Sequence, residues 1–220
     1  MNEQRFTILT ADPPWGYNDH NTGGSFKSGS GNHYTTLTPE TVAKMRIPEI
    51  CADDSVLFLW ATTPLLPDIL PVMKAWDFEY KTSVFWYKKD PVPGRKFRLG
   101  MGHYFRGMME MCLVGVRGKV KPFGCQSQNV IIEKPRGHSQ KPDGFWDLLE
   151  HATGDINPNR NLELVPVPGK KDGRFGQCYT MVDINPLPRI ELFCRGEPRP
   201  LWFGWGNQCT GQRKVELDIL

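Results

Sequence analysis

The chain has 220 residues, of which 39% are hydrophobic and 23% are charged, and its formal net charge is +3. These values are typical of a soluble globular protein, and the length suits one α/β domain while leaving too little chain for two. The small positive charge permits binding to nucleic acid but does not by itself argue for it.

Membrane, secretion and metal signals are missing from the sequence. No apolar stretch has the length of a membrane-spanning helix, and residues 1–4 do not begin a signal peptide. The six cysteines form no Cys-x-x-Cys pair and have no histidine at zinc-ligand spacing. We therefore expect an intracellular, cytoplasmic protein with no membrane segment and no metal site.

The first predicted element is a buried strand at residues 5–11, which ends abruptly at Asp12-Pro13-Pro14-Trp15. Each proline fixes φ and lacks an N–H, so this backbone is stiff and presents carbonyl acceptors. The Asp12 carboxylate is a further acceptor, and Trp15 offers a flat apolar face. The combination suits a planar ring with an exocyclic amino group, such as adenine.

Such a cluster has a chemical use. The amino nitrogen of adenine is a poor nucleophile because its lone pair is shared with the ring. Two acceptors, the Asp12 carboxylate and the Pro13 carbonyl, would draw the nitrogen toward tetrahedral geometry and favour the transition state over the ground state. The alternative is an ordinary strand-ending turn with a half-buried tryptophan.

A polar, glycine-rich stretch follows at residues 16–32, and a lid over the site and a plain surface loop both stay open as interpretations. Thr38 as N-cap and Pro39 at the first helical position predict a helix that runs to about Met45. Residues 47–50 are then expected to form a short turn.

The next elements form an α/β crossover unit. Residues 55–62 are an apolar run of strand length, and residues 80–86 are a second predicted strand. Between them, residues 65–76 predict a helix that Pro71 should kink. The expected apolar face of this helix is Leu66, Ile69, Leu70, Met73 and Trp76.

Residues 88–106 are basic and aromatic, and two shorter strands are predicted after them at residues 110–116 and 129–133. Cations for phosphates and rings for bases are what a nucleic-acid channel needs, and a solvated charged loop is the alternative. The residues in question are Lys88, Lys89, Arg95, Lys96, Phe97, Arg98, His103, Tyr104, Phe105 and Arg106.

Pro142 begins a predicted helix with Phe145, Trp146, Leu148, Leu149 and Ala152 as its apolar face. Lys141, just ahead of that helix N-terminus, is placed to hold an anionic ligand, although an exposed structural lysine is the alternative.

Residues 189–195 are the last predicted strand. Arg195 lies at its C-terminal end, where ligands of open α/β sheets bind. Residues 202–208 are expected to close the domain.

Six stretches, in this order, resemble the MT-A70 family of S-adenosylmethionine-dependent adenine-N6 methyltransferases. They cover residues 11–15, 57–60, 112–118, 138–143, 190–195 and 206–208. The resemblance implies an α/β, Rossmann-like methyltransferase fold in permuted order, with a mostly parallel central sheet flanked by helices. Residues 1–220 would form a single domain with an insertion at about 154–188.

The resemblance also implies the roles of the site residues. Catalysis would rest on Asp12, Pro13, Pro14 and Trp15, and Lys141 would contact the methionine carboxylate of S-adenosylmethionine. The other expected cofactor contacts are Asp12, Phe193, Arg195, Glu197, Asn207 and Gln208. The acceptor adenine would meet Trp15, Tyr34 and Glu110, with Tyr104 and Arg106 from the basic segment on the nucleic acid.

The chain departs from the family pattern in three places. It begins too close to Asp12 to supply the acidic cofactor contact that eukaryotic members have upstream. Its insertion contains two β-like runs, 162–167 and 178–184, around Lys170-Lys171-Asp172-Gly173, which predicts a hairpin. This hairpin either extends the nucleic-acid surface or is a decorated loop. After Arg195, Gly196-Glu197-Pro198 replaces the usual polar residues, and Glu197 is placed to accept from ribose hydroxyls.

The leading hypothesis is methyl transfer to adenine N6 in nucleic acid, with DNA preferred over RNA because compact chains resemble bacterial and phage DNA modifiers. A homodimer or heterodimer is left open. A catalytically inactive nucleic-acid-binding module is the second hypothesis, and the intact Asp12 and Lys141 speak against it. A nicotinamide-dependent oxidoreductase lacks its Gly-x-Gly-x-x-Gly turn after the first strand.

Overall fold

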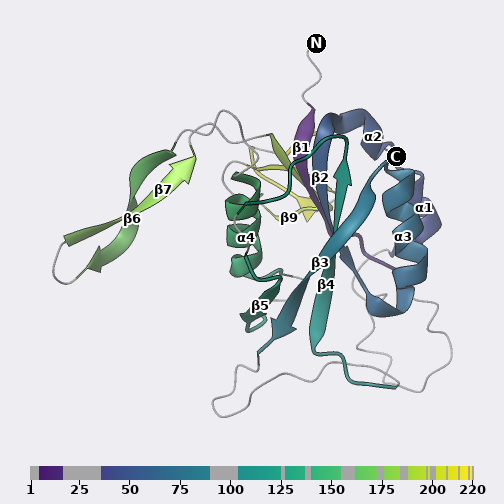
Figure 1. Cartoon of the computed structure of the whole chain (residues 1–220), viewed down its shortest axis with the longest axis horizontal. Coiled ribbons are helices and arrows are strands. Elements are labelled where there is room, and N and C mark those ends of the chain that lie inside the picture. The colour runs from purple at the N-terminus through teal and green to yellow at the C-terminus, as the bar shows by residue number, and fades with distance from the viewer. Residues whose placement is uncertain are drawn as a thin grey trace.

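The computed structural model, shown in Figure 1, describes most of the chain. For residues 162–172, 176–183, 195, 196 and 208 the description is of the backbone. The described residues are 5–16, 36–89, 104–124, 127–136, 140–154, 162–172, 176–183, 188–196, 198, 202–206, 208–212, 214–217 and 219.

The centre of the molecule is a 7-stranded sheet in the order β10-β8-β1-β2-β4-β3-β5. All neighbours are parallel except those of β4, which runs antiparallel to both β2 and β3. This is the mostly parallel, Rossmann-like sheet that the sequence predicted. The strands are β1 (Phe6–Ala11), β2 (Cys51–Ala61), β3 (Glu79–Lys88), β4 (Met109–Arg117), β5 (Val130–Glu133), β8 (Arg189–Leu192) and β10 (Phe203–Trp205).

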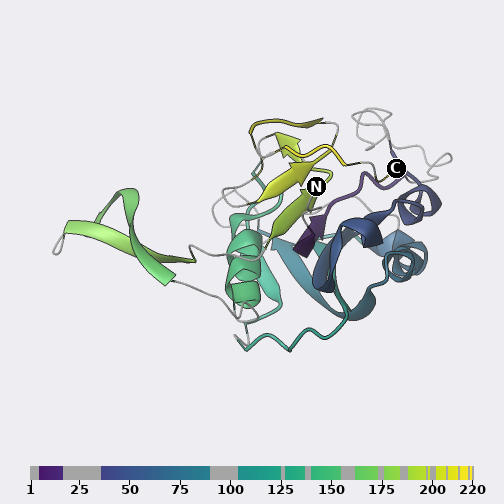
Figure 2. The ribbon, with the colours of Figure 1, turned by 90° about the horizontal axis from the view of Figure 1, so that it is seen from above.

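Helices cover both faces of this sheet, with α1 and α3 on one side and α4 on the other (Figures 1 and 2). Thr38 caps α1 by accepting a hydrogen bond from the Thr41 amide, and Pro39 follows at the first helical position, as predicted. The helical segments are α1 (Pro39–Ala43), α2 (Ile47–Ile50), the 3-10 turn η2 (Thr63–Leu65), α3 (Leu66–Ala75) and α4 (Asp143–Gly154).

Alternating side chains of the strands feed two cores. Leu9 and Ala11 of β1 join the core beneath α1 and α3, whereas Ile8 joins the core beneath α4. The α4 core is aromatic: the Phe145 ring lies 4.7 Å from Trp60, and the rings of Trp146 and Trp202 are 5.2 Å apart. Burial on both sides explains why the central strands are continuous apolar runs.

The structure corrects several element predictions. Leu70, expected on the buried face of α3, is 37% exposed, and Val72 is buried instead. The strand expected at residues 189–195 ends at Leu192, because Phe193 adopts a positive φ of 61° and turns the chain. Residues 47–50, expected as a turn, form the short helix α2. The strand expected from residue 55 begins at Cys51.

The hairpin predicted between residues 154 and 188 is confirmed by the antiparallel pairing of β6 (Leu162–Asp172) with β7 (Gly176–Asp183). Figure 1 shows this hairpin projecting away from the sheet, beyond α4. A second small sheet, formed by β9 (Arg195–Gly196) and β11 (Gln208–Cys209), is parallel. Among the described residues, no helix is both long and apolar enough to cross a membrane.

Candidate active site

The Asp12-Pro13-Pro14-Trp15 segment leaves the C-terminal end of β1 in a conformation held by backbone hydrogen bonds. The Trp15 amide donates to the Pro13 carbonyl at 2.8 Å, and the Leu37 amide donates to the Pro14 carbonyl at 2.8 Å. Because a carbonyl oxygen has two lone pairs, Pro13 keeps one for a ligand. The return bond from Gly16 to the Leu37 carbonyl, 2.9 Å, ties this segment to the chain before α1.

Trp15 anchors the segment from below. Its indole Nε1 donates to the Trp60 carbonyl at 2.8 Å, and the residue is only 5% exposed. A buried indole N–H that lacked this acceptor would cost free energy, so the bond fixes the ring and the prolines before it. The structure therefore places Trp15 mainly in the core beneath α1 and α3.

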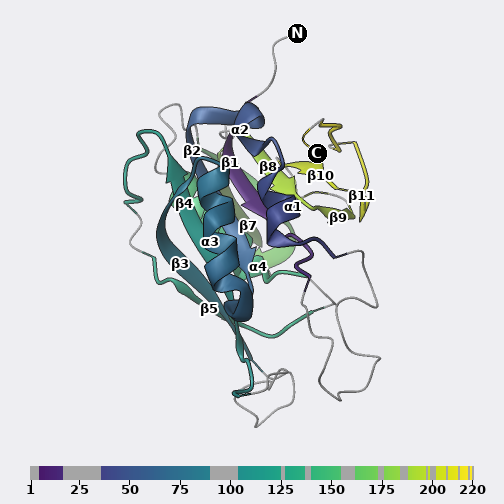
Figure 3. The same cartoon turned by 90° about the vertical axis from the view of Figure 1, so that its right-hand side faces the viewer.

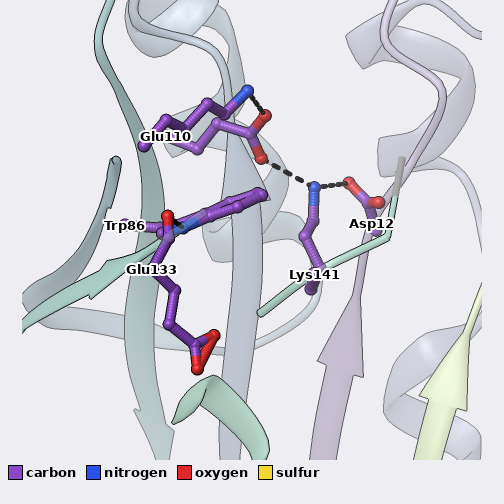
Figure 4. A network of polar contacts seen from close by, with 6 residues as sticks. Asp12, Trp86, Glu110, Glu133 and Lys141 are labelled. Carbon is purple, nitrogen blue, oxygen red and sulfur yellow. Dashed lines mark hydrogen bonds and ion pairs between the residues drawn. The ribbon is translucent and has the colours of Figure 1, made fainter. Parts of the chain in front are cut away.

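Lys141 lies between the two carboxylates at the centre of the site, as Figure 4 shows. Its Nζ is 3.0 Å from Asp12 Oδ1 and 3.0 Å from Glu110 Oε2. The same ammonium lies 4.5 Å from the centre of the Trp60 ring, within cation–π range. Three residues that are far apart in sequence thus meet at the end of the sheet where β1 and β2 finish and β4 begins.

Glu110 has a second cationic partner. Lys88, at the end of β3, forms an ion pair with Glu110 Oε1, and its Nζ lies 5.1 Å from the centre of the Trp86 ring.

The Trp86 indole donates to the Glu133 carbonyl at 3.0 Å, and the Glu133 carboxylate accepts from the Gly144 amide at 3.2 Å. The first turn of α4 is therefore held against the end of β5.

Charge pairing keeps Lys141 and Glu110 ionised. Burial alone would lower the pKa of Lys141, but attraction to Asp12 and Glu110 outweighs it, so the pKa lies above its ordinary value of 10.5. Burial alone would raise the pKa of Glu110, but Lys141 and Lys88 bring it below its ordinary value of 4.5. At neutral pH the ammonium and the Glu110 carboxylate both carry their charges.

The C-terminal end of β8 lies beside Asp12. Ala11 pairs with Leu192, and the Asp12 amide is 3.5 Å from the Leu192 carbonyl. Phe193 follows directly, half-buried, with its ring 5.7 Å from that of Trp205. The backbones of Arg195 and Gln208 then pair in the β9–β11 sheet. Ligands of open α/β sheets bind at this edge.

The other predicted site residues divide into two groups. Tyr104 and Arg106 are exposed, on the segment that leads into β4. Tyr34, Glu197 and Asn207, like the glycine-rich stretch from residue 17 on, lie outside the described residues.

Sequence reasoning missed the role of Trp60, which supports both Lys141 and Trp15. The available signal was its position near the end of a buried strand. Lys88 begins the basic and aromatic segment for which a nucleic-acid channel and a solvated loop are both open, and the structure pairs its ammonium with Glu110. Among the described residues, no three histidine, cysteine, aspartate or glutamate side chains form a group able to hold a metal ion.

Comparisons with known proteins agree on one family. The profile of the MT-A70 family matches residues 6–166. The chain is 32% identical over 161 residues to the type II methyltransferase M.MunI of a Mycoplasma species, covering 66% of each protein. It is 26% identical over 219 residues to the human N(6)-adenosine-methyltransferase catalytic subunit METTL3, covering 98% of this chain and 30% of METTL3.

A Drosophila melanogaster protein named N(6)-adenosine-methyltransferase MT-A70-like protein is 25% identical over 222 residues. The match covers 98% of this chain and 29% of the Drosophila protein. The chain thus spans 66% of the length of M.MunI and 30% of that of METTL3. The family match extends over most of the sequence, including the strand that precedes Asp12 and the helix that follows Lys141. The chain belongs to the MT-A70 family.

Proposed function

We propose that this protein transfers a methyl group from S-adenosylmethionine to the N6 amino group of an adenine in nucleic acid. The observation that carries the proposal is the stiff acceptor pair at the end of β1, Asp12 and Pro13, with the Lys141 ammonium 3.0 Å from Asp12 Oδ1. Relatives named N(6)-adenosine-methyltransferases match 98% of this chain, which supports the same reaction here.

The acceptor pair acts on the amino nitrogen. The ion pair with Lys141 engages Asp12 Oδ1, and we assign Oδ2 and the second lone pair of the Pro13 carbonyl to the two N–H groups of adenine. Hydrogen bonds that strengthen as the nitrogen becomes tetrahedral lower the barrier more than they stabilise the bound substrate. We also assign to the Asp12 carboxylate the role of accepting the proton that the nitrogen releases.

The residues around Lys141 fit the cofactor. An ammonium whose side chain is 13% exposed, at the edge of the sheet where ligands bind, is suited to the methionine carboxylate. We assign Phe193, Arg195, Glu197, Asn207 and Gln208 to the rest of the cofactor. S-adenosylmethionine, when bound, supplies an electrophilic methyl group, so no covalent enzyme intermediate is needed.

Two assignments concern the acceptor side. We propose that Glu110, with Tyr34, lines the adenine pocket, and that Tyr104 and Arg106 contact the nucleic acid. Because Trp15 is buried and hydrogen-bonded, we propose that its main role is to hold Pro13 and Pro14 in place. Stacking of the adenine on Trp15 stays a prediction.

Of the two nucleic acids we propose DNA, and the support is the 32% identity to M.MunI, which is named a type II methyltransferase, against 26% to METTL3. The test is incubation of the purified protein with labelled S-adenosylmethionine and either unmethylated genomic DNA or bulk RNA, followed by digestion to nucleosides. Label in N6-methyldeoxyadenosine is the expected result. Label in N6-methyladenosine alone would reject DNA, and cofactor binding without any transfer would reject the reaction on these substrates.

A further inference from the structure

Two adjacent aromatic side chains stand almost entirely in solvent. Tyr104 is 96% exposed and Phe105 is 91% exposed. Among the described residues, the next most exposed large hydrophobic side chain is Ile132, at 64%. Adjacent apolar rings that remain in water without packing against the protein mark a surface that meets a ligand.

The aromatic pair is tethered to the candidate active site. The Lys88 amide donates to the Met108 carbonyl at 2.9 Å, and Met109 pairs with Tyr87 as β4 begins. Glu110, which contacts Lys141, comes five residues after Phe105 in the chain. Five residues span at most ~18 Å, so the Phe105 ring lies within the reach of one bound substrate. In Figure 1 this segment leaves the lower end of β4 and runs beneath the sheet. Figure 3 shows it at the same end of the molecule, opposite both termini.

The charges around the pair suit a polyanion. Arg106 follows Phe105 directly and is exposed, as is Lys89 on the adjoining end of β3. The carboxylate of Glu110, the first acidic residue after Arg106 in the chain, is already paired with Lys88 and Lys141. Exposed cations beside exposed rings favour nucleic acid over an apolar protein surface as the occupant.

The depth of the site adds a requirement. The Asp12 side chain is 29% exposed and Pro13 is buried, so the acceptor pair lies partly below the protein surface. A base stacked within a duplex cannot reach recessed atoms and has to leave the helix first. The gap that it leaves destabilises the duplex unless another ring fills it.

We propose that Phe105, supported by Tyr104, enters a DNA duplex at the position vacated by the target adenine. The inference rests on the proposed function and deepens it, because it makes duplex DNA the substrate form. Phe105 is a positioning residue in this role: it touches the neighbouring bases and holds the extruded state open, while Asp12 and Pro13 act on the adenine itself.

The test compares initial rates of methyl transfer to native and to heat-denatured unmethylated DNA. For Phe105→Ala, the ratio of native to denatured rates should fall on the order of ten-fold or more, the equivalent of the ~1–3 kcal/mol of one base–aromatic stack. Phe105→Trp should restore the ratio, because a larger ring fills the gap. Where denatured DNA is a poor substrate for the wild type, a duplex with abasic sites opposite adenine replaces it.

The matched control is Tyr80→Ala, which removes another exposed aromatic ring. Tyr80 is 45% exposed and pairs with Gly115, at the end of β3 away from Glu110. The ratio of native to denatured rates in Tyr80→Ala should therefore equal that of the wild type. An unchanged ratio in Phe105→Ala overturns the proposal. Equal losses on both DNA forms, with an altered oligomeric state by light scattering, would assign the rings to a protein interface instead. Failure of the wild type on every DNA would reject the proposed function itself.

Discussion

Replacement of Lys141 by methionine is the sharpest perturbation of the charge network, because it keeps an unbranched apolar stem of similar length and removes the ammonium. In the wild type that ammonium is 3.0 Å from each of two carboxylates. Lys141→Met would leave Asp12 and Glu110 without their shared counter-charge, although Glu110 would keep Lys88. The variant should therefore be less stable and should bind S-adenosylmethionine more weakly.

The size of the stability loss follows from burial. Removing one partner of a fully buried ion pair costs ~3–5 kcal/mol, because an uncompensated charge is left behind. The Asp12 and Glu110 side chains are 29% and 31% exposed, so water can solvate part of the orphaned charge. We expect a loss of ~2 kcal/mol in the free energy of unfolding, a fall of ~4–8 °C in Tm for a chain of this size.

Urea unfolding at pH 7, followed by circular dichroism, measures this loss, and Lys119→Met at an exposed site is the matched control. The pH dependence of the free energy of unfolding is a second test, because its direction follows from the two pKa shifts. The pKa of Glu110 is lowered in the folded state, so the stability it contributes is present above its ordinary pKa of 4.5 and is lost as pH falls through the lowered value. The pKa of Lys141 is raised, so its contribution lasts until pH rises through a value above 10.5.

The difference between wild type and Lys141→Met should therefore be constant from about pH 5 to 10 and should narrow in acid. A variant as stable as the wild type at pH 7, or a difference that widens in acid, would refute the reasoning. Unchanged affinity for S-adenosylmethionine by calorimetry would separately refute the cofactor assignment of Lys141.

Two further substitutions test the framework of the site. Trp15→Phe removes the hydrogen bond to the Trp60 carbonyl and should lower the free energy of unfolding in urea by ~1–3 kcal/mol, together with turnover. A loss of stability below about 0.5 kcal/mol would show that the indole N–H does not anchor the segment. Gly118→Ala forces a side chain onto a residue with φ of 70°, where its Cβ would clash with the Asp53 carbonyl, and should lower stability by ~2 kcal/mol or more; wild-type stability would mean that this turn relaxes freely.

The strands could be predicted from the sequence where the local residue pattern matches burial in the fold. Their order in the sheet could not, because it depends on pairing between residues far apart in sequence. Apolar runs identified β1, β2, β3 and β4, but the insertion of antiparallel β4 between β2 and β3 depends on partners far apart in sequence. In α3, Leu70 lies about 100° around the helix from Ile69, so the sheet buries Val72 in its place. The turn at Phe193 was hidden because an apolar, β-like run gives no sign of a positive φ.

The site was predictable residue by residue and not as an assembly. Asp12 and Lys141 were each nominated, from a stiff acceptor motif and from a position before a helix, yet their direct contact depends on the packing of β1 against the chain before α4. Glu110 was assigned to the substrate side, and its bonds to two lysines are visible only in the fold. Trp60 lies near the end of a predicted buried strand, but its ring contact with Lys141 is visible only in the fold.

The most direct test of the central claim is the effect of Asp12→Ala on turnover and on cofactor affinity, measured with the same protein preparation. Methyl transfer to unmethylated DNA, followed by nucleoside analysis, gives the first quantity, and calorimetry with S-adenosylmethionine gives the second. Because Lys141 keeps Glu110 as a partner, we predict that cofactor affinity is largely retained while N6-methyldeoxyadenosine formation is lost. A variant that still forms N6-methyldeoxyadenosine at the wild-type rate would contradict the role of Asp12 as acceptor for the amino group.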